Sequence, residues 1–160
     1  ASFVKPVILE TNGVYAVNSA GTGNYNVYKI PTKNLKEYFL IENRQFEGFD
    51  RTLSVNANNR PLKNAGIAIW HINEAFGNNE NMGKRLVAIE EASEKTLGYS
   101  FIKKDNNDYR SDPFYSSKVN TEFSSTSMPN NQTYSGEPQP WKITDISASS
   151  NVMKFKFTRL

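Results

Sequence analysis

Short runs of alternating apolar and polar residues, separated by turn residues, make up most of the chain. An alternation with a period of two is typical of a β-strand with one buried face. The runs that show it, or that are continuously apolar as in a fully buried strand, are residues 13–17, 25–30, 38–44, 66–72, 85–92, 141–146 and 152–158. This pattern predicts an all-β fold, an antiparallel β-sandwich with a jelly-roll-like arrangement of strands.

Turn residues between the runs indicate how neighbouring strands connect. Residues 21–24 contain two glycines and an asparagine, which favours a β-hairpin joining residues 13–17 to residues 25–30. Residues 48–65 are polar and rich in asparagine, so we expect a loop there. A short helix over residues 73–77 is an alternative to a simple turn.

Residues 105–136 carry almost no apolar periodicity and are rich in Asn, Ser and Asp. A stretch of this length without a strand or helix pattern is unusual inside a compact domain, and such stretches often carry function. No repeat or linker divides the chain. We therefore expect a single β-sandwich domain over residues 1–160, with one long irregular loop.

Composition excludes several classes of function. The 19 basic and 16 acidic residues are scattered, and no basic cluster is interleaved with aromatic residues, so we expect no nucleic-acid partner. No apolar run reaches the length of about 18 residues that a membrane span needs. The absence of cysteine excludes disulfide bonds, a thiol nucleophile and a cysteine-based zinc site.

His71 is the only histidine, which limits the catalytic chemistry open to the chain. With one histidine and no HExxH sequence, the chain cannot assemble a catalytic zinc held by two or more imidazoles, and no GxSxG turn marks a serine nucleophile. We therefore predict that this chain is not an enzyme and holds no catalytic residue and no zinc ligand. Because Ile67 and Ile69 share the face of His71, we expect a partly buried histidine bonded to a carboxylate, either Glu42 or Glu90.

Charged residues within the predicted strands indicate a structural polar network of Glu42, Arg44, His71 and Glu90. Glu42 and Arg44 lie two residues apart and share a face, where a strand-to-strand ion pair is expected. Glu90 and Glu91 are adjacent and should point to opposite faces, so they cannot flank one substrate bond. We expect one of them to face solvent or an ion pair, and the other to reach His71 or Arg44.

Oxygen-bearing side chains in the long loop allow a calcium site. Calcium takes about six to eight oxygen ligands. Asp105, Asp108, Asp112 and Asn120 could supply some of them, although their spacing differs from that of an EF-hand loop. Solvated loop acids are the alternative interpretation.

Aromatic residues in the same loop allow a binding surface. Tyr109, Phe114 and Tyr115 are candidates for contact with a glycan or a protein. In this interpretation the chain is a secreted binding module that uses residues 105–136. Trp70 and Trp141 lie among apolar strand residues, so we expect them to pack in the core.

Several longer segments carry a family resemblance. Residues 37–45 read EYFLIENRQ, residues 66–73 read GIAIWHIN, and residues 85–92 read RLVAIEEA. They are similar to the lines EYFLLENRQ, GLLIWHID and VxLxEAD of the immune inhibitor A family of secreted bacterial zinc metalloproteases. The likeness extends, in order, to shorter segments at residues 15–17, 27–31, 48–50, 111–115, 120–123, 127–136, 143–147 and 153–155.

In that family these lines follow the zinc-binding catalytic domain and form a β-rich accessory region. The resemblance implies that the chain is a fragment of a larger, secreted or cell-surface bacterial protease: its non-catalytic C-terminal accessory domain. Its partners would be the catalytic domain of the same polypeptide, which would hold the zinc, and a protein or glycan substrate. Asn73 and Ser93 stand where the family has aspartates, so a metal-binding or contact role of those acids would be weakened here.

Overall fold

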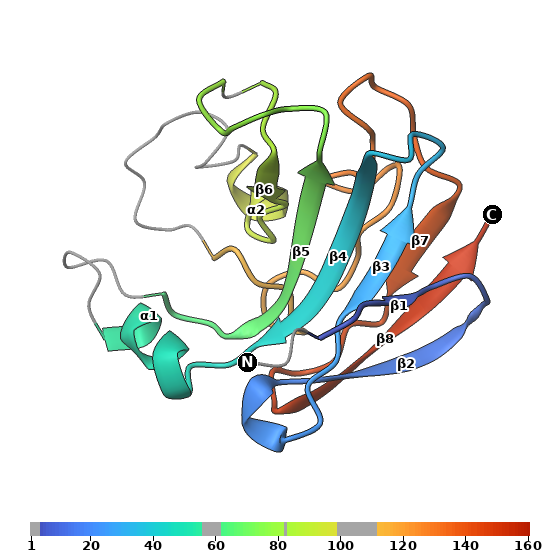
Figure 1. Ribbon diagram of the computed structural model, residues 1–160. Coiled ribbons are helices and arrows are strands. Elements are labelled where there is room, and N and C mark those ends of the chain that lie inside the picture. The colour runs from blue at the N-terminus through green and yellow to red at the C-terminus, as the bar shows by residue number, and fades with distance from the viewer. Residues whose placement is uncertain (1–3, 56–61, 82, 99–111) are drawn as a thin grey trace.

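The computed structural model describes residues 4–55, 62–81, 83–98 and 112–160, whose strands form two sheets (Figure 1). The five-stranded sheet has the order β1 (Val7–Ile8), β3 (Tyr28–Pro31), β4 (Glu37–Arg44), β5 (Gly66–Asn73) and β6 (Val87–Ile89). The three-stranded sheet has the order β2 (Gly13–Asn18), β8 (Val152–Arg159) and β7 (Trp141–Thr144). Two packed sheets with few helices confirm the predicted all-β sandwich.

Side chains between the two sheets form the main core. β4 and β5 pair in antiparallel fashion along their whole length, with Phe39 opposite His71 and Ile41 opposite Ile69. Because side chains alternate along a strand, these four residues share one face, which we call the inner face. Phe39 and Ile41 pack in one buried cluster with Phe155 of β8, so the inner face is the one that meets the three-stranded sheet.

The predicted hairpin between β2 and β3 is wrong, because the two strands belong to different sheets. β2 pairs with β8, whereas β3 pairs with β4 and with the short parallel strand β1. Residues 19–27, which include the 3-10 helix η1 (Ala20–Thr22), cross from one sheet to the other. Side chains replace the missing strand partner, since the Asn26 amide and the Tyr28 hydroxyl both donate to the Ala16 carbonyl of β2, at 3.1 and 2.7 Å.

Short helices occupy two segments for which the sequence pattern predicts none. The 3-10 helix η2 (Gly48–Asp50) and α1 (Arg51–Val55) lie in the predicted polar loop, and α2 (Glu94–Leu97) comes shortly after β6. Residues 74–76 form a turn, so the alternative helix over 73–77 is absent. Among the described residues, no helix is long and apolar enough to cross a membrane.

Residues 112–136 form the described part of the predicted irregular loop, and they contain isolated bridges in place of full strands. Phe123 is fully buried, and its backbone exchanges two hydrogen bonds of 2.9 Å with Ile143 of β7. Asn131 is also fully buried, and its amide donates to the Trp141 carbonyl at 2.7 Å. The segment therefore packs against the sandwich as part of its structure, through the side-chain amides that make it look loop-like in sequence.

Gly66, the first residue of β5, allows residues of the irregular segment to approach the sheet closely. The backbones of Ile67 and Tyr115 exchange hydrogen bonds of 2.9 and 2.8 Å, and a Cβ on Gly66 would lie 2.2 Å from the Tyr115 carbonyl oxygen. We expect Gly66→Ala to lower the free energy of unfolding by about 1–3 kcal/mol, the usual cost of overpacking, as measured by urea denaturation. Gly77→Ala is the matched control, because a Cβ there meets no atom within 4 Å. Equal stability of the two variants would contradict the close approach.

Candidate functional site

The single histidine lies in a buried cluster of three residues, His71, Glu37 and Glu90, which we call the histidine clamp. β5 places His71 on the inner face, where it is 4% exposed. Its Nε2 atom lies 2.7 Å from Oε1 of Glu37 on β4, and its Nδ1 atom lies 3.0 Å from Oε1 of Glu90, which directly follows β6. Both carboxylates are buried. Three neighbouring chain segments of one sheet therefore each contribute one ionisable side chain.

Aromatic rings hold the imidazole from both sides. The rings of Phe39 and Tyr134 stack on the His71 ring, each with a centroid distance of 4.4 Å. The Tyr134 backbone N–H donates to Oε1 of Glu37 at 2.8 Å, and the Asn73 amide donates to Oε2 of Glu37 at 3.1 Å. The irregular segment thus closes the clamp with both the ring and the backbone of Tyr134.

These contacts restrict the chemistry of the clamp. Each ring nitrogen of His71 faces a carboxylate oxygen, an arrangement that an imidazolium satisfies by donating from both nitrogens. A metal ion needs a nitrogen lone pair directed at it, and a general base needs a nitrogen within reach of the substrate. Neither nitrogen of His71 is available for these roles. The geometry therefore favours a structural function, in which buried hydrogen bonds of His71 join adjacent strands.

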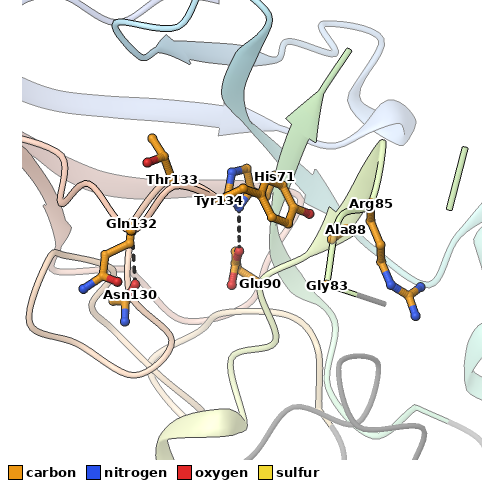
Figure 2. A pocket seen from close by; sticks show the side chains of 10 residues that line it. His71, Gly83, Arg85, Ala88, Glu90, Asn130, Gln132, Thr133 and Tyr134 are labelled. Atoms are coloured by element: carbon orange, nitrogen blue, oxygen red, sulfur yellow. Dashed lines mark hydrogen bonds and ion pairs between the residues drawn. The ribbon is translucent and has the colours of Figure 1, made fainter. Parts of the chain in front are cut away.

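A pocket of about 450 Å³ borders the clamp (Figure 2). His71 and Glu90 line it together with Tyr134, Arg85 and part of the irregular segment. In Figure 2 the Glu90 carboxylate lies directly below the imidazole, whereas the Arg85 side chain extends away from both residues. The pocket therefore reaches the clamp without freeing a ring nitrogen for a ligand.

A second polar cluster, the Glu42 cluster, lies on the outer face of the five-stranded sheet. Oε1 of Glu42 accepts from the Trp70 indole N–H at 2.8 Å and from Arg44 at 3.3 Å, and Oε2 accepts from the Tyr25 hydroxyl. The Arg44 guanidinium also donates to Asp50 at 2.7 Å. Burial and then the hydrogen bond to Glu42 raise the pKa of Tyr25 well above its usual value. The Tyr25 phenol therefore keeps its proton at neutral pH and donates a hydrogen bond to Glu42.

The predicted network of Glu42, Arg44, His71 and Glu90 is therefore two separate clusters. His71 contacts Glu90, one of its two expected partners. Glu42 does not contact His71, because the register of β4 and β5 places the two side chains on opposite faces. The ion pair of Glu42 and Arg44 is present, but it forms within β4 and not between strands.

Sequence reasoning misses two residues that complete the clamp. Glu37 lies two positions before Phe39 and shares its face, so extending the predicted strand by one residue would have identified it. Tyr134 lies in a segment without periodicity, and no local pattern indicates that it stacks on His71. Asn73 likewise acts through a tertiary contact, because its amide reaches Glu37 on the neighbouring strand.

Glu90 and Glu91 are both 2% exposed. β6 ends at Ile89, so strand alternation does not extend through the two acids. Glu90 reaches His71, as expected for one of the pair, and Glu91 is buried away from solvent. Burial, followed by the charges of Glu90, Glu94 and Glu91, raises the pKa of Tyr115 well above its usual value.

The structure places two of the four candidate calcium ligands, because Asp105 and Asp108 lie outside the described residues. Asp112 is partly buried and accepts from the Asn64 amide at 3.1 Å. The Asn120 amide donates to two backbone carbonyls, and its oxygen accepts from a backbone N–H. Hydrogen bonds within the protein thus already involve both the amide nitrogen and the oxygen of the Asn120 side chain. In the described part of the chain, no group of three or more His, Cys, Asp or Glu side chains could hold a metal ion.

The predicted binding surface of loop aromatics is wrong for the two described members. Phe114 and Tyr115 are 4% and 0% exposed, because the backbone of Tyr115 pairs with Ile67 and draws both rings against the sheet. Tyr109 lies outside the described residues. Trp141 is buried in the core as expected, whereas Trp70 is only partly buried, on the outer face.

Comparison with models of known protein families and with curated proteins finds no match for this chain.

Proposed function

We propose that the chain is a non-catalytic accessory domain of a secreted bacterial zinc metalloprotease resembling immune inhibitor A. The observation that carries the proposal is the histidine clamp. Both nitrogens of His71 are bonded to buried carboxylates, and its two ring faces are covered by Phe39 and Tyr134. The only imidazole of the chain is thus engaged in hydrogen bonds that join adjacent strands.

The location of the family-like segments supports the same proposal. The EYFLIENRQ line supplies Glu37, the GIAIWHIN line supplies His71 and Asn73, the RLVAIEEA line supplies Glu90, and residues 127–136 supply Tyr134. Segments that lie far apart in sequence thus meet in one buried cluster. A resemblance that includes the segments forming this buried cluster supports a shared scaffold.

Asn73 supports a scaffold role for the position where the family has aspartate. Its amide donates to Oε2 of Glu37, and its oxygen accepts from the Ala75 backbone N–H at 3.0 Å. An aspartate could accept the second hydrogen bond but could not donate the first. Asparagine at this position therefore gives Glu37 a hydrogen-bond donor, where aspartate would place a second negative charge beside it.

In the proposed parent protein, zinc and catalysis belong to a separate catalytic domain of the same polypeptide. The β-sandwich stabilises that domain or shapes the access of a protein or glycan substrate. The alternative of a binding module based on residues 105–136 loses its support from Phe114 and Tyr115, since both are buried. A calcium ion in that segment remains a prediction, which a comparison of melting temperatures in EDTA and in millimolar calcium tests.

The purified chain should show no zinc-dependent proteolysis. We expect incubation with zinc and fluorescent casein to release no more signal than buffer with zinc, because no ring nitrogen is free to hold the metal. Isothermal titration should likewise detect no stoichiometric zinc binding. Cleavage that needs zinc and disappears in His71→Asn would contradict the proposal. A coding sequence without an HExxH-bearing segment ahead of this chain would contradict the parentage alone.

A further inference from the structure

A groove of about 400 Å³ crosses the outer face of the five-stranded sheet. Outward-facing side chains of the central strands form its floor, including Leu40 of β4 and Ile72 of β5. Val87 of β6 lines it on one side, and Pro6 and Val27 line it on the other. Val87 is 37% exposed. The groove thus offers an apolar surface on the part of the outer face that lies over Leu40 and Ile72.

One end of the groove is acidic. Glu42 is the sole charged residue among the described residues that line it, and its side chain is 11% exposed. Two of its three donors, Trp70 and Tyr25, are neutral. The third, Arg44, lies 3.3 Å away and makes a shorter contact of 2.7 Å with Asp50. The Glu42 cluster therefore carries two carboxylates and one guanidinium, a net negative charge on a chain whose formal charge is +3.

The walls beside Glu42 are aromatic. Trp70 and Tyr25 both line the groove, and both are held in place by hydrogen bonds to the Glu42 carboxylate. A cation placed against the face of an aromatic ring is attracted by the ring, and a neighbouring carboxylate adds a charge-assisted hydrogen bond. The aliphatic stem of a lysine or arginine would cover apolar surface at the same time.

The edge of the sheet beside the groove is closed to strand addition. The Asn79 amide donates to the Val87 carbonyl, and its oxygen accepts from the Val87 N–H, both at 2.9 Å. One side chain thus occupies the hydrogen-bonding positions that an added strand would use on β6. A strand added at Val87 would have to displace the Asn79 side chain, which favours the face of the sheet as the contact surface.

We propose that this groove docks a segment of a partner protein that places a lysine or arginine against Glu42, Trp70 and Tyr25. Apolar residues next to that basic side chain lie along Leu40, Ile72 and Val87. The occupant follows from charge complementarity, because a cation balances the excess negative charge of the Glu42 cluster. The docking surface is independent of the proposed protease parentage, since it rests on the groove alone.

Titration of the ¹⁵N-labelled chain with short peptides tests this docking. The probe is the acetylated and amidated peptide Leu-Arg-Leu, and the neutral comparison replaces arginine with norleucine. The indole N–H signal of Trp70 should shift saturably with the basic peptide, whereas that of the core residue Trp141 should not move. Loss of a hydrogen bond to a charged group should weaken binding of the norleucine peptide about tenfold or more.

Two variants distinguish the effect of the Glu42 charge on binding from an effect on folding. Glu42→Gln should bring the affinity for the basic peptide down to that for the neutral peptide, while an unchanged Trp141 signal reports an intact core. Glu137→Gln removes a charge from an exposed ion pair with Lys33 and should leave binding unchanged. Equal affinities of the two peptides for the unmodified chain would overturn the proposal. So would the absence of a Trp70 shift at the highest peptide concentration.

Discussion

Replacing His71 by leucine should lower the free energy of unfolding by about 3–5 kcal/mol, the usual cost of removing one partner from a buried ion pair. Leucine fills most of the space between Phe39 and Tyr134, so lost packing is a small part of the effect. The larger part is electrostatic, because Glu37 and Glu90 remain buried and each loses its imidazole partner. Urea denaturation followed by circular dichroism measures the change.

Neutralising the two carboxylates as well should restore part of this stability. In the triple variant His71→Leu/Glu37→Gln/Glu90→Gln, the amides still accept hydrogen bonds but carry no charge. We expect this variant to be more stable than His71→Leu alone, because replacing a whole buried ionic group is often nearly neutral. A single substitution that costs less than about 1 kcal/mol would place His71 among ordinary packing residues. Equal stability of the single and triple variants would show that packing dominates.

β4 and β5 show what local sequence determines well. Both strands match their predicted ranges to within one residue, and β4 has Phe39 and Ile41 inside with Glu42 outside, as the alternation predicts. The nearly continuous apolar run of β5 correctly predicts a strand covered on both faces, since all but one of its residues are buried. Periodicity identifies a strand and its two faces without knowledge of its partners.

Partners are harder to predict because they depend on pairing between distant segments. The glycines before Tyr25 favour a hairpin, but β2 pairs instead with β8, where Tyr15 meets Phe155 and Val17 meets Met153. A local turn pattern carries no information about this pairing of the two ends of the chain. The same limit explains the missed clamp residue Tyr134, whose position depends on how the irregular segment packs.

Asparagine content illustrates the same contrast. The abundance of Asn is a sound indicator of turns, yet several of these residues act as buried links in the core. Asn43 is 2% exposed, and its amide donates to the carbonyls of Val17, Ser150 and Asn151 at 3.0, 2.9 and 3.1 Å. Val17 belongs to β2 and the other two precede β8. One side chain of the five-stranded sheet therefore bonds to two segments of the three-stranded sheet.

Asn43→Asp should destabilise the domain by about 3 kcal/mol or more, because an acceptor replaces the donor that faces three carbonyl oxygens. The substitution keeps the shape of the side chain, so the loss reports the hydrogen bonds and the buried charge and not a cavity. Asn78→Asp is the matched control. The Asn78 side-chain oxygen accepts a hydrogen bond from the Glu80 N–H, and an aspartate oxygen accepts it equally well. Urea midpoints of the two variants measure the difference. Similar midpoints would mean that the hydrogen bonds of Asn43 do not stabilise the contact between the two sheets.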